Sequence, residues 1–263
     1  EGITKLHIHA SEWYENNGLL LEAFRHATEA NDVERAVRLM ESKKMPLHIR
    51  GTATTILEWL RSLPISLLDN RPNLWWMQAA MLLVIGEPAG VEEMLLKAEA
   101  ALKALSLPGS DLDESTRDLL GKIAAARANL AQTQAQADTI LVQAHRSLEY
   151  LHPDNLSERS MAIRALGFAC YIQGEYAEAS RLYTEALNLA QKAGDTINTI
   201  LASLRVGQIQ ESENQLYLAM KTYLNVLPLL DDYSTYNAPV AYLGLARIFY
   251  EWNDLNSAEQ YGE

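Results

Sequence analysis

The sequence predicts an all-α fold built from stacked pairs of helices. Apolar residues recur with a period near 3.6 along most of the chain, and no run of alternating apolar and polar residues with a hairpin turn pair is found. A pattern of small residues also repeats at spacings of 39, 40 and 39 residues. A unit of that length holds two helices, so the repetition predicts a solenoid of helix hairpins.

Four repeats align on a small residue in the first helix of each. A turn-compatible residue follows seven positions later, and the second helix starts two positions after that. The small residues are Ala128, Gly167, Gly207 and Ala246, the turn residues are Ala135, Gly174, Asn214 and Asn253, and the second helices of the first three units continue with Ala144, Tyr183 and Tyr223. We expect the small residue to allow close helix packing and the turn residue to end the first helix in a left-handed conformation.

The apolar pattern of residues 1–105 predicts further helix hairpins, in which the repeat is degenerate. Periodicity places short helices at 6–14, 19–30, 33–42 and 50–62, with breaks at Gly18, Asn31-Asp32, Met45-Pro46 and Pro64. Within residues 74–102, Ala79 and Gly86 keep the small-residue and turn spacings of the later repeats. Residues 106–114 predict a linker loop, in which Asp113 could cap the next helix. Residues 115–263 hold the regular repeats, and we expect one continuous solenoid.

Composition and charge exclude several classes of protein. The chain has 263 residues, of which 48% are apolar and 21% charged, as in globular proteins. Its net charge of −12 disfavours nucleic acid and anionic lipid as partners. The single cysteine excludes an internal disulfide, and the longest apolar run, 79–85, is too short to cross a bilayer. We therefore expect a cytoplasmic protein and, since the sequence lacks an initial Met and ends within a repeat, a piece of a longer one.

No motif predicts catalysis or a metal site. On a helix, His7 and His9 would point about 200° apart and could not share a metal ion. The sequence has no G-x-x-x-x-G-K-[ST], G-x-S-x-G or H-E-x-x-H motif. Cys170 falls on an apolar stripe, where a small thiol is ordinary packing. We expect no enzyme activity, no metal and no cofactor in this chain.

A candidate binding face lies on the first helices of the four repeats, on the side away from the second helices. The positions three before, one after and four after each small residue fall one turn apart on this face. Their mixture of guanidinium groups, amides, a carboxylate and aromatic rings suits a small-molecule site. The predicted ligand-binding residues are Asn129, Gln132, Arg164, Phe168, Tyr171, Gln208, Glu211, Arg247 and Tyr250.

Two other interpretations of this face stay open. In one, the aromatic residues only pack between neighbouring repeats and the two arginines pair with nearby acids. In the other, the groove takes a peptide or a partner helix, as many helical-repeat scaffolds do. A closed pocket would favour a metabolite, whereas an open trough would favour a chain.

Parts of the sequence resemble a known family. The hairpin spacing is similar to that of tetratricopeptide repeats, although the period is about five residues longer than the ~34 expected. Residues 6–41, 59–64 and 250–258, which include the strings ASEWYENNG and YEWNDL, resemble the sensor region of MalT-like, LuxR-type ATP-dependent transcriptional regulators of the STAND class. The resemblance covers essentially the whole chain and implies a right-handed superhelical solenoid.

The resemblance also implies a role in sensing. Such regulators combine an ATPase, a winged helix, a helical-repeat sensor and a C-terminal helix-turn-helix. This sequence has neither a phosphate-binding loop nor a basic recognition helix, so it corresponds to the sensor alone. A small-molecule inducer in the concave groove would relieve autoinhibition, and other domains or copies of the full-length regulator would be its partners. The sensor itself would contact no nucleic acid and no membrane.

Overall fold

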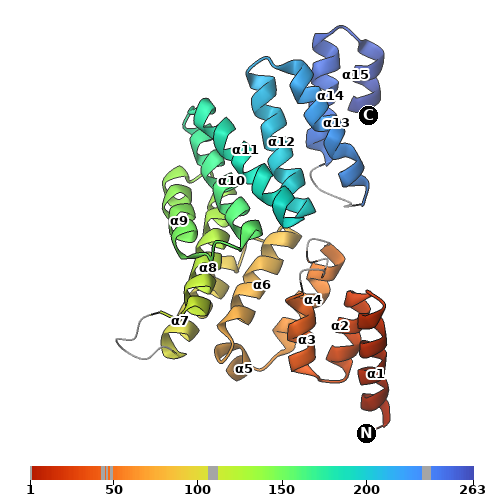
Figure 1. The fold of residues 1–263 in the computed structure, drawn as a ribbon, viewed down its shortest axis with the longest axis vertical. Helices are drawn as coiled ribbons and strands as arrows, with labels where there is room; N and C mark the ends of the chain where they lie inside the picture. The colour runs from red at the N-terminus through yellow and green to blue at the C-terminus, as the bar shows by residue number, and fades with distance from the viewer. Residues whose placement is uncertain (1, 43–44, 46, 48–49, 106–111, 233–237) are drawn as a thin grey trace. The chain divides into compact units, whose positions relative to one another are not determined.

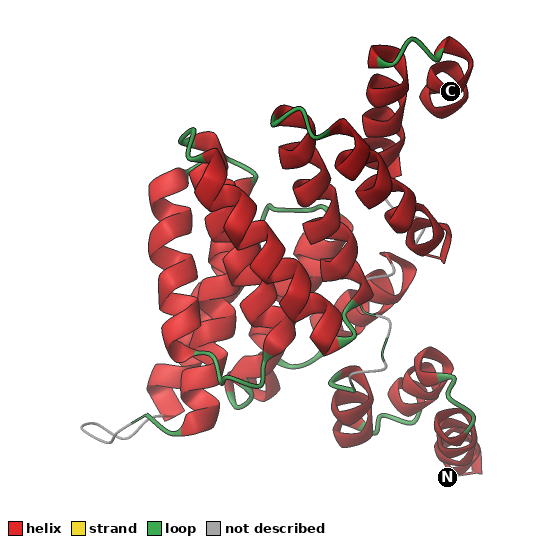
Figure 2. Ribbon diagram, turned by 45° about the horizontal axis from the view of Figure 1, so that its top comes forward, coloured by secondary structure: helices red, strands yellow, loops and turns green. Residues whose placement is uncertain are grey.

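A computed structural model of the chain describes residues 2–42, 45, 47, 50–105, 112–232 and 238–263 (Figure 1). Fifteen α-helices and no strand occur in these ranges, which confirms the predicted all-α fold (Figure 2). None of the helices in them is long and apolar enough to cross a membrane. The chain divides into two compact units, Glu1–Ala101 and Leu102–Glu263.

The first unit contains the helices predicted before residue 102. These are α1 (Gly2–Asn16), α2 (Leu20–Glu29), α3 (Val33–Met40), α4 (Arg50–Ser62), α5 (Ile65–Asp69), α6 (Pro72–Ile85) and most of α7 (Val91–Leu105). The predicted breaks are confirmed at Gly18 and Asn31, where φ is +77° and +55°. Helix α5 was not predicted, because five residues are too few to show a helical period.

The second unit is a series of helix hairpins. It holds α8 (Glu114–Gln132), α9 (Ala137–Tyr150), α10 (Leu156–Ile172), α11 (Tyr176–Ala193), α12 (Thr196–Ser212), α13 (Leu216–Asp232), α14 (Ala238–Glu251) and α15 (Leu255–Gly262). Asp113 caps α8, since its carboxylate accepts a hydrogen bond from the Thr116 N–H at 2.7 Å. Each helix packs against the next one along the chain, and the first helices of the hairpins (α8, α10, α12 and α14) also contact one another in turn. Most of the predicted linker lies outside the described residues.

A residue in the left-handed conformation ends the first helix of each hairpin in the second unit, as predicted. The φ angles are +51° at Ala135, +84° at Gly174, and +58° at Asn214 and Asn253. This conformation reverses the chain in the same way each time, so successive hairpins stack in the same register. A β-carbon costs about 1–2 kcal/mol in this region, which makes Ala135 the least suited residue of the four.

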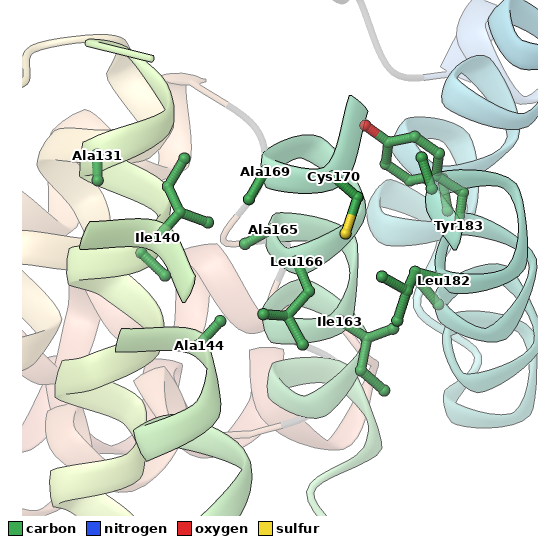
Figure 3. Close-up of a cluster of buried hydrophobic side chains, with 14 of the residues drawn as sticks. Ala131, Ile140, Ala144, Ile163, Ala165, Leu166, Ala169, Cys170, Leu182 and Tyr183 are labelled. Carbon is green, nitrogen blue, oxygen red and sulfur yellow. The ribbon is translucent and has the colours of Figure 1, made fainter. Parts of the chain in front are cut away.

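Glycines in the first helices allow tyrosine rings of the second helices to lie against the backbone. A β-carbon on Gly167 would lie 2.9 Å from the ring of Tyr183, and one on Gly207 would lie 2.5 Å from the ring of Tyr223. Both rings are fully buried. Figure 3 shows Tyr183 among the apolar side chains of this core, together with Cys170, whose thiol has a pKa raised by burial. The cysteine is therefore part of the packing, as expected.

Candidate ligand-binding face

The predicted binding residues lie on α8, α10, α12 and α14, and side-chain contacts join these helices in turn. We term this row of contacts the first-helix face. Its residues are Asn129, Gln132, Arg164, Phe168, Arg205, Gln208, Glu211 and Arg247. It includes seven of the nine predicted residues. The spacing rule therefore identified a set of side chains that do come together.

Arg164 joins α8 to α10 and is buried. Its Nη1 donates to Oε1 of Gln132 at 3.3 Å, and Gln132 donates to Oδ1 of Asn129 at 3.2 Å. Only 7% of Arg164 is exposed, so it does not lie on an open wall as expected. Burial, reinforced by the charge of Arg205, lowers the pKa of Arg164 to about 10. In one of the interpretations left open this arginine pairs with an acid, whereas in the structure it pairs with an amide.

The junction between α10 and α12 contains two guanidinium groups and an aromatic ring. Arg205 lies over the ring of Phe168, 5.5 Å from its centre, and donates to Oε1 of Gln208 at 2.8 Å. Within the described residues, neither Arg164 nor Arg205 forms an ion pair with a carboxylate. The hydroxyl of Tyr183, from α11, is buried there, and burial raises its pKa to about 12. This junction is rich in donors and neither arginine pairs with an acid, although the charge of Asp195 opposes the lowering of the Arg164 pKa.

The junction between α12 and α14 contains a closed ion pair. Glu211 accepts hydrogen bonds from Nε and Nη2 of Arg247, at 2.8 and 2.9 Å, and from the hydroxyl of Tyr223 at 2.7 Å. Burial, together with the bond to Glu211, raises the pKa of Tyr223, and the same carboxylate raises the pKa of Arg247. Here the expectation that an arginine of this face pairs with an acid is confirmed.

An open cavity of about 510 Å³ lies beside this ion pair. Glu211, Arg247, Leu243 and Tyr250 contribute to its lining, and Tyr250 is 67% exposed. The volume is in the range of about 300–1,000 Å³ that holds metabolites. Because the cavity is open to solvent, it combines the size expected for a metabolite with the shape expected for a chain.

Tyr171 does not join the polar contacts of the row. It forms a T-shaped pair with Tyr176 of α11, with ring centres 5.6 Å apart. Its side chain is 37% exposed. It therefore flanks the α10–α12 junction as an accessible aromatic surface.

Sequence reasoning missed three polar groups of this region, namely the guanidinium of Arg205 and the hydroxyls of Tyr183 and Tyr223. The two tyrosines were identified only as positions of the repeat pattern in the second helices. A buried tyrosine hydroxyl needs a hydrogen-bond partner, so their recurrence after a glycine was a usable signal. Arg205 lies outside the three positions per helix that defined the face. Its long side chain nevertheless reaches the ring of Phe168.

The histidines of the first unit form no metal centre in the described residues. His7 of α1 and His26 of α2 approach each other through their Nδ1 atoms at 2.8 Å, and His9 is exposed. No three His, Cys, Asp or Glu side chains converge as metal ligands in the part of the chain that the structure describes.

The sequence is similar to a bacterial protein kinase and to a bacterial transcriptional regulator, among others. It is 26% identical to the serine/threonine-protein kinase PknK of Mycobacterium tuberculosis, over 97% of this chain and 23% of that protein. It is 23% identical to the HTH-type transcriptional regulator MalT of Yersinia enterocolitica, over 98% of this chain and 28% of that protein. The chain therefore spans about a quarter of the length of these relatives.

The fold is similar to that of known structures. A signal transduction ATPase with numerous domains and a tetratricopeptide repeat sensor, from Pyrococcus horikoshii, has a TM-score of 0.71 at 15% identity, over 99% of this chain and 39% of that chain. Aspartyl phosphate phosphatase F from Bacillus subtilis has a TM-score of 0.51 at 14% identity, over 98% and 72%. Residues 121–263, more than half of the sequence and all of the first-helix face, match the family model of the MalT-like TPR region. The chain therefore belongs to the family of MalT-like TPR regions.

Proposed function

We propose that this chain is the effector-sensing region of a longer ATP-dependent transcription regulator and that it binds a small-molecule inducer on the first-helix face. This proposal is carried by the row of polar and aromatic side chains that joins the first helices of four successive hairpins, with a cavity of about 510 Å³ at its α12–α14 end. Aromatic rings supply apolar contact there, and the guanidinium groups supply directional hydrogen bonds. The similarity to the transcriptional regulator MalT supplies the regulatory context.

The inducer acts by changing how the hairpins pack. A ligand that contacts α12 and α14 together holds two neighbouring hairpins in one arrangement. It shifts the regulator only if it binds that arrangement more tightly than the autoinhibited one. In this proposal it relieves autoinhibition and favours ATP-bound self-association, with other domains or copies of the full-length regulator as partners. This chain itself contacts neither DNA nor a membrane.

Calorimetric titration of the 263-residue chain against a panel of metabolites tests the proposal. A true inducer binds and raises the melting temperature. Arg247→Gln, which removes the charge at the cavity, should weaken binding about tenfold. Arg181→Gln is the matched control, because Arg181 lies on α11 and pairs with Glu178 and Glu185 away from the cavity. If no compound binds the wild-type chain, the proposal is wrong.

Binding of a peptide or partner helix is a second candidate function. The open shape of the cavity and the exposure of Tyr250 and Leu243 favour it. Fluorescence anisotropy with labelled peptides separates the two candidates. The second candidate is favoured if a peptide binds the wild-type chain, Arg247→Gln abolishes that binding, and no metabolite binds. The ligand of the first-helix face would then be a polypeptide and not a small-molecule inducer.

A further inference from the structure

Arg164 is a buried cation without a counter-ion in the described part of the chain. Its single hydrogen bond, to Gln132, is long at 3.3 Å, and its Nε has no partner among the described residues. A buried guanidinium is costly unless an anion or several strong acceptors surround it. One neutral amide oxygen does not meet that requirement, so this arginine is poorly satisfied by the protein itself.

Two further donors converge on the same place. Arg205 lies over the ring of Phe168, which is one turn from Arg164 on α10. The ring of Tyr183 packs against Gly167 of the same helix. In agreement with this arrangement, the charge of Arg205 lowers the pKa of Arg164.

The Tyr183 hydroxyl is buried and has no hydrogen-bond partner in the described residues. In Figure 3 its ring packs in the apolar cluster, and its oxygen lies at the border of that cluster. The charge of Asp195 acts on Arg164, but its carboxylate accepts hydrogen bonds from Asn198 and forms no ion pair with either arginine in the described residues. Two like charges and a phenol without a paired carboxylate favour an anion between them.

The next junction shows what such a group of donors needs. The Tyr223 hydroxyl, at the position equivalent to Tyr183, donates to the carboxylate of Glu211, which is 12 residues earlier in the chain. The residue 12 positions before Tyr183 is Tyr171, which has no carboxylate. The α10–α12 junction therefore has a tyrosine hydroxyl and two arginines at the place where its neighbour has a carboxylate.

We propose that the ligand of the first-helix face carries a compact anionic group, a carboxylate or a phosphate, which Arg164, Arg205 and Tyr183 bind. Guanidinium groups bind both anions through paired hydrogen bonds. Arg205 and the ring of Phe168 are only half-buried, so an anion can reach the group from the accessible side. In a chain of net charge −12, two arginines without an ion pair in the described residues make a local positive region that selects an anion. This inference rests on the proposed function and names the chemical class of its ligand.

Thermal unfolding of the whole chain with defined probes tests the inference. The probes are inorganic phosphate, benzoate and the neutral sugar glucose, each at constant ionic strength. We expect phosphate or benzoate to raise the melting temperature by several degrees and glucose to leave it unchanged. The phosphate and benzoate arms distinguish the two anion chemistries. Arg164→Met and Arg205→Gln should abolish the shift, whereas Arg181→Gln, on the exposed face of α11, should keep it.

A second readout separates a ligand-binding arginine from a structural one. Without added anion, Arg164→Met should melt at or above the temperature of the wild type, because the change removes a buried unpaired charge and its repulsion by Arg205. A structural arginine would lower the melting temperature when removed. Arg205→Gln keeps the test valid if Arg164→Met does not fold, since Arg205 is half-buried.

The outcomes distinguish this inference from the proposed function. No response of the wild type to either anion, or an equal response of Arg164→Met and the wild type, overturns the anionic ligand. If a neutral metabolite then binds the chain in titration, the proposed sensor function stands without the anion. If an anion binds and requires Arg164 and Arg205, the inference is supported.

Discussion

The α10–α12 and α12–α14 junctions follow one pattern but balance their charges differently. In both, a tyrosine of the second helix packs its ring against a glycine of the first. In one junction the hydroxyl of Tyr223 meets Glu211, which also binds Arg247. In the other, the Tyr183 hydroxyl has no hydrogen-bond partner, and the neighbouring arginines form no ion pair with an acid in the described residues. The repeat thus fixes the position of the ring, whereas the partner of the tyrosine hydroxyl differs between the two junctions.

The largest expected effect concerns the glycines that hold the ring of Tyr223. Gly207→Ala and Gly244→Ala would place β-carbons 2.5 and 2.4 Å from this ring. We expect each change to lower the free energy of unfolding by about 1–3 kcal/mol, because the ring is enclosed and cannot shift. Gly167→Ala should lower the free energy of unfolding by less, since its β-carbon would lie 2.9 Å from the ring of Tyr183, which is farther than at the other two positions. Denaturant unfolding of the three variants measures the order.

Gly51→Ala is the control for these substitutions. Nothing lies within 4 Å of a β-carbon at Gly51, which is in α4. Alanine should therefore be neutral or stabilising there by up to about 1 kcal/mol, because it has the higher helix propensity. A cost at Gly207 no greater than at Gly51 would show that the close packing of Tyr223 does not constrain the repeat.

The next effect concerns the ion pair. Glu211→Gln removes the charge that binds Arg247 and Tyr223, and the carboxylate is 16% exposed. We expect a loss of about 1–3 kcal/mol in the free energy of unfolding. Glu185→Gln, an acid on the exposed face of α11, should change stability little. Equal losses in both variants would mean that Glu211 is no more than a surface carboxylate.

Transfer of the acid sharpens the comparison. Tyr171→Glu places a carboxylate at the position equivalent to Glu211, 12 residues before Tyr183. It should stabilise the ligand-free chain by about 1 kcal/mol through new charge-assisted hydrogen bonds. It should also abolish the response to phosphate and benzoate, because the internal carboxylate competes for the arginines. Tyr171→Gln, which adds no charge, should show neither effect in the same melting experiment.

The sequence predicted the hairpins because their signals are local. A left-handed residue seven positions after each small residue follows from the steric requirements of a helix end, so Ala135 and Gly174 could be identified without knowledge of the fold. Helix α5, of five residues, gave no such signal. Whether the two units form one continuous solenoid stays a prediction.

The residues of the first-helix face were predicted, with Arg205 as the exception, but their accessibility was not. Helical spacing fixes which residues share a face, and that rule placed Arg164 beside Gln132. It does not fix how much the neighbouring helices cover. At the position three before the small residue, Arg164 and Leu204 are buried, whereas Leu243 of α14 is 51% exposed. Arg205 was missed because its contact with Phe168 depends on side-chain length and conformation, which periodicity does not describe.

The smallest expected effect concerns Glu158, in the first turn of α10, and it has the opposite sign to that of Glu211. Burial raises the pKa of Glu158, Lys122 opposes the shift, and Asp118 and Asp195 add to it. The carboxyl group therefore holds its proton more tightly in the folded chain than in the unfolded chain. Its ionisation opposes folding at neutral pH, and this cost disappears as the pH falls through the raised pKa toward the ordinary value of 4.5.

Glu158→Gln should accordingly stabilise the chain at neutral pH by a small amount, because the substitution removes a charge whose burial opposes folding. The gain should shrink toward zero near pH 4, where the wild-type carboxyl is protonated in both states. Unfolding of both proteins as a function of pH measures it, with Glu211→Gln as the comparison. Because Glu211 is bound by donors and Glu158 is half-buried without an ion pair in the described residues, the two substitutions should change stability in opposite directions at neutral pH. A loss of stability in both variants would instead mean that a cationic partner stabilises the ionised carboxylate of Glu158 in the folded chain.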